Sequence, residues 1–358
     1  MHLSLLASLD PHCRQRGAEL LSGTHPDSVI VVHDLLDDGL GNSALVLRRI
    51  YRQGELQERS SGRLEHGCLS CTVRLDLVPT VRRLIREGVP HAVLALPPGV
   101  EPDMVVEALY AGLEEAFCID NAVLALDPAE LEDQLWDRRG LSALGLTSYP
   151  KDPRTQGEFL VGTLAQADTV LPSPSLANAL IEAAHPQRAL GLELLHELAP
   201  HAAVALRTEQ VRPGCFDLDE LMARQAPGEV RVAEDRGPGV FRTVRYQLQR
   251  PLHPERFRAV LPELAAGSCW VRGRLWLAST PERRIAVRGI GPRLWLENTG
   301  DWLPGIEQPG SVLALTGRAD ELIESEVHDL LDSAQLSLAE AGNRPEYFDD
   351  PFGLDSRH

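Results

Sequence analysis

LSLLASL at residues 3–9, followed by the loop DPHCRQRGAEL at residues 10–20, decides the fold of the first half of the chain. The first segment is an almost continuous apolar run, which is typical of a parallel strand covered on both faces. Similar runs follow it, and between them lie stretches with apolar residues three and four apart, as in helices. This alternation predicts a doubly wound, mostly parallel α/β sheet. The expected later strands are SVIVVH (28–33), AVLAL (92–96), NAVLAL (121–126), ADTVL (167–171) and AAVAL (202–206), and the expected helices are VRRLIREG (81–88), MVVEALYAGLEEA (104–116), LANALIEAA (176–184) and ALGLELLHEL (189–198).

The second half of the chain has a different pattern. A polar, Pro- and Gly-bearing stretch at 207–239 predicts a linker between a first domain at 1–206 and a second at 240–340. Period-two alternation in the second domain predicts an antiparallel sheet, which with two helices makes a smaller α+β unit. Residues 341–358 are expected to be an acidic tail. The strand segments are FRTVRYQL (241–248), SCWVRGRLWLA (268–278), RIAVRGI (284–290) and PRLWLE (292–297), and the helices are ERFRAVLPEL (255–264) and ADELIESEVHDLLDSAQL (319–336).

The lysine count excludes one kind of nucleotide site. Of 35 basic residues in the 358-residue chain, only Lys151 is a lysine, and it lies in YPKDP without a Gly-rich loop before it. A phosphate-binding P-loop needs a lysine that reaches the β- and γ-phosphates, so a Walker-type site is excluded. No apolar run reaches the roughly 18 residues that cross a bilayer, and the first residues lack a basic signal region. Six cysteines without a regular framework fit a reducing cytoplasm.

Charge is divided unevenly along the chain. The formal net charge is −17, yet residues 236–293 hold twelve arginines against three glutamates. An acidic body repels phosphate backbones and suits a basic protein partner. The Arg-rich 236–293 block could contact ribosomal RNA through its Arg and Trp side chains. It could equally be a solvated sheet face that balances the acidic C-terminal residues.

The cysteine turn HGCLSCT (66–72) is the best candidate for chemistry. Cys68 and Cys71 lie on one tight turn, where two thiols can bind a soft metal or close a disulfide. Two thiolates are half of a zinc shell, and His66, His33 or Asp34 could complete it. The alternatives are a redox switch or an inert thiol pair. Taken singly, His33 and His66 are more typical of hydrogen-bonded structural histidines than of metal ligands. The other four cysteines are expected to be core residues.

Several motifs, in the same order along the chain, resemble those of the CobW family of metal-linked P-loop GTPases. The cysteine turn is similar to the family's metal-binding turn, and RPLHPERF (250–257) with CWVRGRLWLA (269–278) and GDWL (300–303) resembles its C-terminal domain. In the family an acidic residue near Asp34 shares the metal. VIVVHDLLDDG (29–39), PPGVEP (97–102) and QADTVL (166–171) lie where the family has its other GTPase segments.

The departures from the family are as informative as the matches. DPHCRQRGAEL replaces the phosphate loop, Leu96-Pro97-Pro98-Gly99 replaces the acidic and Thr-Gly end of the third strand, and PSPS (172–175) replaces the guanine-reading motif. Each change removes a group that GTP chemistry needs. The family hydrolyses GTP, but these changes predict a pseudo-GTPase to which GTP does not bind in the ordinary way.

Cys68-Leu69-Ser70-Cys71 has two cysteines where the family has three. This spacing resembles an actinobacterial branch whose members recruit a ribosome hibernation factor under zinc limitation. The resemblance implies a cytoplasmic, zinc-responsive bacterial regulator with the hibernation factor and the ribosome as partners. The alternatives are a zinc metallochaperone that acts on a client metalloprotein, and a metal-free scaffold. The sequence indicates no oligomeric state.

Overall fold

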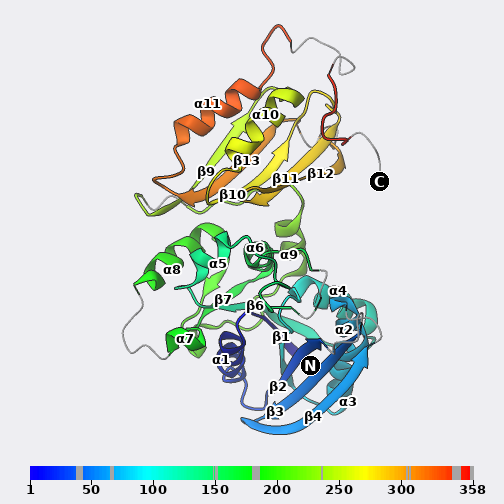
Figure 1. Cartoon of the computed structure of the whole chain (residues 1–358). Coiled ribbons are helices and arrows are strands. Elements are labelled where there is room, and N and C mark those ends of the chain that lie inside the picture. Colours follow the sequence, from blue (N-terminus) through cyan, green and yellow to red (C-terminus); the bar gives the residue numbers. More distant parts are fainter. Residues whose placement is uncertain are drawn as a thin grey trace. The chain divides into compact units, whose positions relative to one another are not determined.

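The computed structural model divides the chain into two compact units (Figure 1). Unit 1 comprises Met1–Leu192 and His201–Leu221, and unit 2 comprises Glu193–Pro200 and Met222–His358. In the described part of the chain, no helix is long and apolar enough to cross a membrane. The structure describes residues 1–37, 43–64, 68–147, 149, 152–179, 186–234, 237–303, 305, 308–340 and 348–354.

Unit 1 is built on an eight-stranded sheet with the order β4-β3-β2-β5-β1-β6-β7-β8. Every pair from β2 to β8 is parallel, which confirms the predicted mostly parallel sheet. Leu5 and Leu6 are neighbours on opposite faces of the central strand and both are fully buried, so both faces are covered. The strands are β1 (His2–Ala7), β2 (Val29–Asp37), β3 (Ala44–Arg52), β4 (Glu55–Leu64), β5 (His91–Ala95), β6 (Cys118–Leu126), β7 (Thr169–Pro172) and β8 (Ala203–Val204).

The antiparallel strands β3 and β4 were not expected from the sequence. β3 pairs with β2 over its whole length, which draws β2 on to Asp37, so Asp34 lies inside this strand and not at its end. β4 is polar and exposed over almost all its residues, as befits an edge strand. Its sequence therefore lacks the apolar signal that marks the buried strands.

Helix α1 packs on the centre of the unit 1 sheet through a glycine. A Cβ on Gly17 would lie 3.0 Å from the Cβ of Ala125 and 3.2 Å from Cδ1 of Leu6, so only glycine lets the helix come this close. Helix α4 packs against both α3 and α6 (Figure 1). The helices of this half are α1 (Pro11–Ser22), α2 (Leu69–Thr72), the π-helix η1 (Val73–Leu77), α3 (Val78–Arg86), α4 (Pro102–Gly112), α5 (Leu131–Trp136), α6 (Gln156–Gln166), α7 (Leu176–Ala179), α8 (Gln187–Leu198), the 3₁₀ helix η2 (Thr208–Gln210) and α9 (Leu218–Gln225).

Unit 2 contains the expected antiparallel sheet, with the order β12-β11-β10-β13-β9. Two helices lie side by side on one face (Figure 1), and the core between them includes the fully buried Phe257, Leu275 and Leu313. The sequence missed β13, which is central and buried in nearly every residue. The elements are β9 (Phe241–Leu248), α10 (Pro254–Leu264), β10 (Cys269–Leu275), β11 (Arg283–Ile290), β12 (Arg293–Asp301), β13 (Ser311–Arg318) and α11 (Glu324–Ala334).

Candidate functional site

The carboxyl ends of the parallel strands form the edge at which open α/β sheets bind ligands. In this chain the loop after β1 places a carboxylate there. Asp10 is the N-cap of α1, and its Oδ1 accepts a hydrogen bond of 2.7 Å from the backbone N–H of Cys13. A helix N-terminus attracts anions through its free N–H groups and its dipole. Here the protein's own carboxylate occupies that position.

Arg14 fills the space beside this cap. Arg14 is only 5% exposed. Its Nη1 donates to the carbonyl oxygen of His33 in β2 at 3.1 Å and to that of Leu96, just after β5, at 2.9 Å. Its Nη2 pairs with Asp34. One guanidinium thus joins the first turn of α1 to β2 and to the end of β5. The sequence singled out no role for Arg14, because nothing in the pattern DPHCRQRGAEL marks an arginine that folds back under its own helix.

A second acidic group lies where β6 and β7 end. Asp127 Oδ2 accepts hydrogen bonds of 2.7 Å from the backbone N–H of Ser175 and from Nδ2 of Asn178, and Glu130 accepts from the Ser175 hydroxyl. Burial raises the pKa of Glu130, and the nearby carboxylates of Asp127 and Asp10 raise it further. The same surroundings raise the pKa of the buried Cys13 thiol. This end of the sheet is therefore acidic.

Cys68 and Cys71 come together in the turn after β4. Their Cα atoms are 5.3 Å apart and the two sulfurs form a disulfide. Cys68 is the N-cap of α2, and its Sγ accepts a hydrogen bond of 3.2 Å from the backbone N–H of Cys71. Helix α2 leads directly into η1, and π-helical turns are frequent at functional sites. Two half-buried sulfurs at this spacing can cycle between a disulfide and a pair of metal-binding thiolates.

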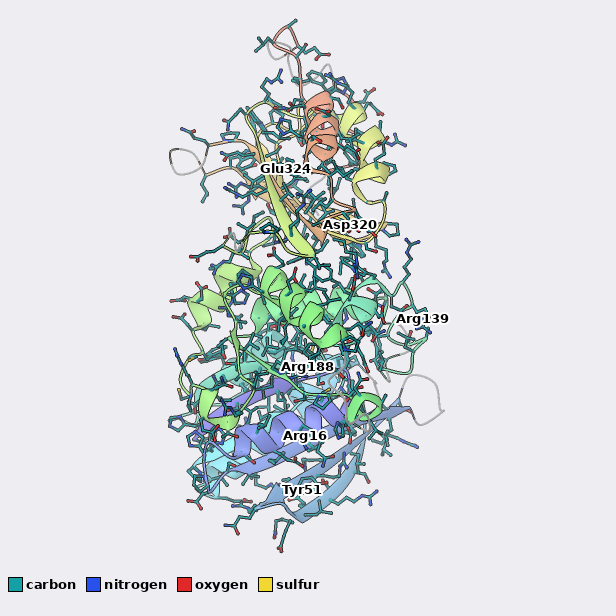
Figure 2. All side chains as sticks on the ribbon, turned by 90° about the vertical axis from the view of Figure 1, so that its left-hand side faces the viewer. Arg16, Tyr51, Arg139, Arg188, Asp320 and Glu324 are labelled. Carbon is teal, nitrogen blue, oxygen red and sulfur yellow. A yellow bond between two sulfur atoms is a disulfide. The ribbon has the colours of Figure 1, made fainter. Side chains whose placement is uncertain are left out.

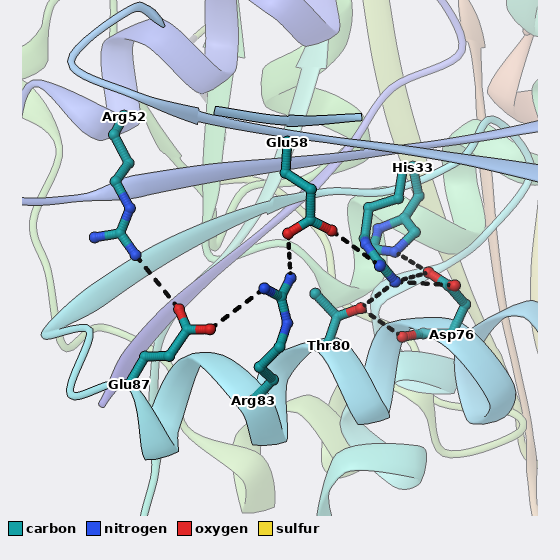
Figure 3. Close-up of polar contacts among 8 residues, drawn as sticks. His33, Arg52, Glu58, Asp76, Thr80, Arg83 and Glu87 are labelled. Atoms are coloured by element: carbon teal, nitrogen blue, oxygen red, sulfur yellow. Dashed lines mark hydrogen bonds and ion pairs between the residues drawn. The ribbon is translucent and has the colours of Figure 1, made fainter. Parts of the chain in front are cut away.

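His33 belongs to a polar network that joins β2 to η1 (Figure 3). It is fully buried, and its Nε2 lies 2.8 Å from Oδ1 of Asp76 on η1. Arg48 on β3 bonds both oxygens of Asp76 at 3.0 Å and the Thr80 hydroxyl at 2.7 Å. Burial alone would raise the pKa of Asp76, but the bonds from His33 and Arg48 outweigh it and hold the pKa below its usual value. Glu58 continues the network, since it pairs with Arg48 at 3.1 Å.

The other predicted ligands are placed differently. Asp34 is held between Arg14 and Arg49, so its carboxylate is already neutralised. His33 points to Asp76 instead, because adjacent strand residues face opposite sides of a sheet. His66 lies outside the described residues. Cys68 and Cys71 are together, and Asp76, the partner that contacts His33, was missed by the sequence reasoning. Its position eight residues after Cys68, two helical turns on, was the available signal.

One arginine of the Arg-rich block, Arg272, is buried inside unit 2. Arg272 is 7% exposed, stacks 3.7 Å from the Trp270 ring centroid and donates to the Thr316 hydroxyl at 2.9 Å. Burial lowers the pKa of Arg272 to about 9. Acidic side chains such as Asp320 and Glu324 are exposed near the start of α11 (Figure 2). The block is therefore partly structural, while Arg288 keeps an exposed guanidinium.

Comparison with known proteins identifies the second unit. Residues 241–335, from β9 to just past α11, match the cobalamin synthesis protein cobW C-terminal domain. Unit 2 therefore contains a CobW C-terminal domain. This confirms the resemblance read from RPLHPERF and CWVRGRLWLA, whereas the actinobacterial branch stays a prediction.

Two relatives of the chain have zinc in their names. A zinc chaperone of Mycobacterium tuberculosis is 28% identical over 249 residues, covering 66% of this chain and 59% of that protein. The zinc-regulated GTPase metalloprotein activator 1 of Dictyostelium discoideum is 22% identical over 309 residues, covering 78% and 63%. The chain thus spans about three fifths of the length of these relatives. A solved structure, the zinc-bound YjiA GTPase from E. coli, aligns over 94% of this chain and 99% of its own at 15% identity, with a TM-score of 0.37.

Proposed function

We propose that this CobW-type chain is a zinc-responsive regulatory protein that does not hydrolyse GTP and that recruits a ribosome hibernation factor when zinc is scarce. The observation that carries the proposal is the start of α1, where the Asp10 carboxylate caps a helix N–H group and the buried Arg14 is paired with Asp34. The CobW C-terminal domain and the names of the relatives support a connection to zinc.

The electrostatics of the carboxyl edge argue against a nucleotide. A phosphate at the start of α1 would meet the Asp10 carboxylate on the N–H groups it needs, and Asp127 and Glu130 nearby. Two like unit charges about 4 Å apart repel each other by on the order of 4 kcal/mol at an effective dielectric constant of 20, which is typical of partly buried groups. No lysine or magnesium-binding hydroxyl follows the loop to offset that cost.

The zinc site is proposed at the reduced cysteine turn. Thiolates of Cys68 and Cys71 would supply two ligands, and His33 offers a third, because its buried Nδ1 has no hydrogen-bond partner among the described residues. His66 is two residues from Cys68 and is the fourth candidate. Asp34 faces the opposite side of β2 from His33 and is paired with Arg14 and Arg49, so it would not share a metal ion with His33. Zinc binding to thiolates is steep in free zinc and can order a surface turn, which suits a sensor.

Partner recruitment is tested by co-purification. Tagged protein from zinc-limited and zinc-replete cells is isolated, and bound ribosomes and hibernation factor are quantified. The proposal expects both only under zinc limitation, and expects Cys68→Ser/Cys71→Ser to abolish the difference between the two conditions. Cys215→Ser, an exposed cysteine outside the turn, is the matched control. A zinc response that survives in the double variant overturns the sensing role, and absence of ribosomes in every sample overturns the recruitment. The exposed Arg288 is the first residue to replace in testing an RNA contact.

The second candidate is a zinc metallochaperone, favoured by the name of the mycobacterial relative. It expects zinc to leave the cysteine turn when GTP and magnesium are added. Zinc-loaded protein is mixed with a chromophoric chelator, and zinc transfer is followed with and without nucleotide. Acceleration by GTP supports the chaperone, and identical rates support the regulator.

A further inference from the structure

A second group of metal-ligating side chains lies at the other edge of the unit 1 sheet, where the parallel strands begin. His2, His91 and Cys118 are the first residues of β1, β5 and β6, and the register pairs His2 with both of the others. Asp120 follows in β6, and His25 lies in the turn between α1 and β2. Because the cysteine turn follows the carboxyl end of β4, which runs in the same direction as β2, the two groups are at opposite edges of the sheet.

Three of these residues have the geometry of a metal site. One ligand atom each from His25, His91 and Asp120 lie within 4.8 Å of one another. Nε2 of His25 is 3.8 Å from Oδ2 of Asp120, and the two imidazole rings stack with centroids 4.2 Å apart. Zinc–nitrogen and zinc–oxygen distances of about 2.0–2.1 Å place the ligand atoms of a tetrahedral site roughly 3.3 Å apart. To close the group around an ion, Nε2 of His25 and Oδ2 of Asp120 would approach by about 0.5 Å, and the other ligand atoms, which lie within 4.8 Å, by at most about 1.5 Å.

The free nitrogens point to a missing partner. His91 is 1% exposed, and its Nε2 bonds the Ser4 hydroxyl at 3.1 Å, while its Nδ1 is buried with no hydrogen-bond partner in the described structure. Nε2 of His25 is likewise buried without a hydrogen bond. A buried polar atom left without a partner costs about 1–3 kcal/mol. Two such nitrogens beside one carboxylate are the arrangement that a cation would satisfy.

The surrounding contacts are those of an outer ligand shell. Ser4 holds the far nitrogen of His91, and Nδ1 of His2 bonds the other oxygen of Asp120 at 2.8 Å. Such bonds set the tautomer and orientation of ligating groups. Burial lowers the pKa of His91 to about 4, so its ring is neutral at pH 7, the form in which imidazole binds metals.

We propose that His25, His91 and Asp120 bind one zinc ion, separately from the cysteine turn. Two imidazoles and one carboxylate are a ligand set that zinc accepts while keeping a fourth position open. His2 and Cys118, which are both exposed, form a second three-ligand group with the same Asp120. The site neither requires nor excludes the sensing role proposed for Cys68 and Cys71.

The test uses the full chain with Cys68, Cys71 and Cys118 changed to Ser, which removes the cysteine turn and the exposed thiol near Asp120. Zinc affinity and stoichiometry are measured by competition with a chromophoric chelator. One zinc per chain is expected, and His25→Gln and Asp120→Asn are each expected to weaken it at least 100-fold. Ser4→Ala, which removes only the outer bond, is expected to weaken it roughly 10-fold.

The matched control is His328→Gln. His328 on α11 lies 3.2 Å from Asp332 but belongs to neither of the three-ligand groups found in the described residues, so zinc binding should not change. Circular dichroism of the metal-free variants shows whether they are folded. If Asp120→Asn does not fold, His25→Gln still tests the site, because His25 is only half-buried. The proposal is overturned if the triple-Ser protein binds no zinc, or if folded His25→Gln binds it as tightly as the triple-Ser parent.

Discussion

Replacing Arg14 by Met should destabilise unit 1 far more than an ordinary surface change. Methionine keeps the length of the apolar stem but removes the guanidinium that bonds the carbonyls of His33 and Leu96 and pairs with Asp34. Hydrogen bonds from a charged donor contribute about 1.5–3 kcal/mol each, and breaking a buried ion pair costs about 3–5 kcal/mol. Since Arg49 still neutralises Asp34, we expect a total loss of about 3–5 kcal/mol.

The matched control is Arg49→Met, because Arg49 pairs with the same carboxylate from a side chain that is 33% exposed. We expect that variant to lose about 1 kcal/mol or less. Four of the five tryptophans lie in unit 2, so fluorescence would follow the wrong half of the chain. Urea-dependent hydrogen exchange of peptides from β1 and β5, read by mass spectrometry, gives the free energy of opening in unit 1. Equal losses in the two variants would refute the structural role of Arg14.

Three further changes test the packing and charge of unit 1. Gly17→Val should lower the free energy of unfolding by about 1–3 kcal/mol, because the larger side chain forces α1 away from Leu6 and Ala125. Gly62→Val is the control and should lower it little, because a Cβ there would meet no atom within 4 Å. Thermal unfolding compares the two variants. Asp76→Asn should make the free energy of unfolding depend less on pH in acid. The lowered pKa of Asp76 stabilises the folded state at pH values above the unfolded pKa of about 3.9, and this stabilisation is lost as the pH falls through the folded pKa. Urea titrations from pH 5 to about pH 2 measure the slope, and an unchanged slope in the variant would contradict this. Glu130→Gln should stabilise at pH 7 and progressively less as the pH falls, because a carboxyl with a raised pKa is least favourable when ionised; a variant that is equally stabilised at pH 4 would contradict the acidic grouping with Asp127.

The buried strands were predictable because each of them is a run of apolar residues. LSLLASL and NAVLAL are apolar on both faces, and both are strands in the structure. The edge strand β4 was not predictable in the same way, because ELQERSSGRL contacts solvent along most of its length and is held by pairing with β3. Pairing is a property of two segments, and no pattern within one of them records it.

In the candidate site, too, the contacts set by local spacing were predictable and those set by pairing between distant segments were not. The proximity of Cys68 and Cys71 follows from their spacing on one turn, so the sequence alone predicts it. The contacts of His33 and Asp34 depend on which face of β2 each residue occupies and on what β3 and η1 bring there. The group around Asp120 depends on three strand starts and a turn meeting at one edge, and the sequence analysis passed over it entirely.

The proposed loss of nucleotide binding is tested by equilibrium binding of fluorescently labelled GTP in the presence of magnesium. Titration of the zinc-free and the zinc-loaded chain should give no saturable signal, because the Asp10 carboxylate already caps the start of α1 and the Arg14 guanidinium is already bonded to His33 and Asp34. Saturable binding with a micromolar dissociation constant, displaced by unlabelled GTP, would contradict the account.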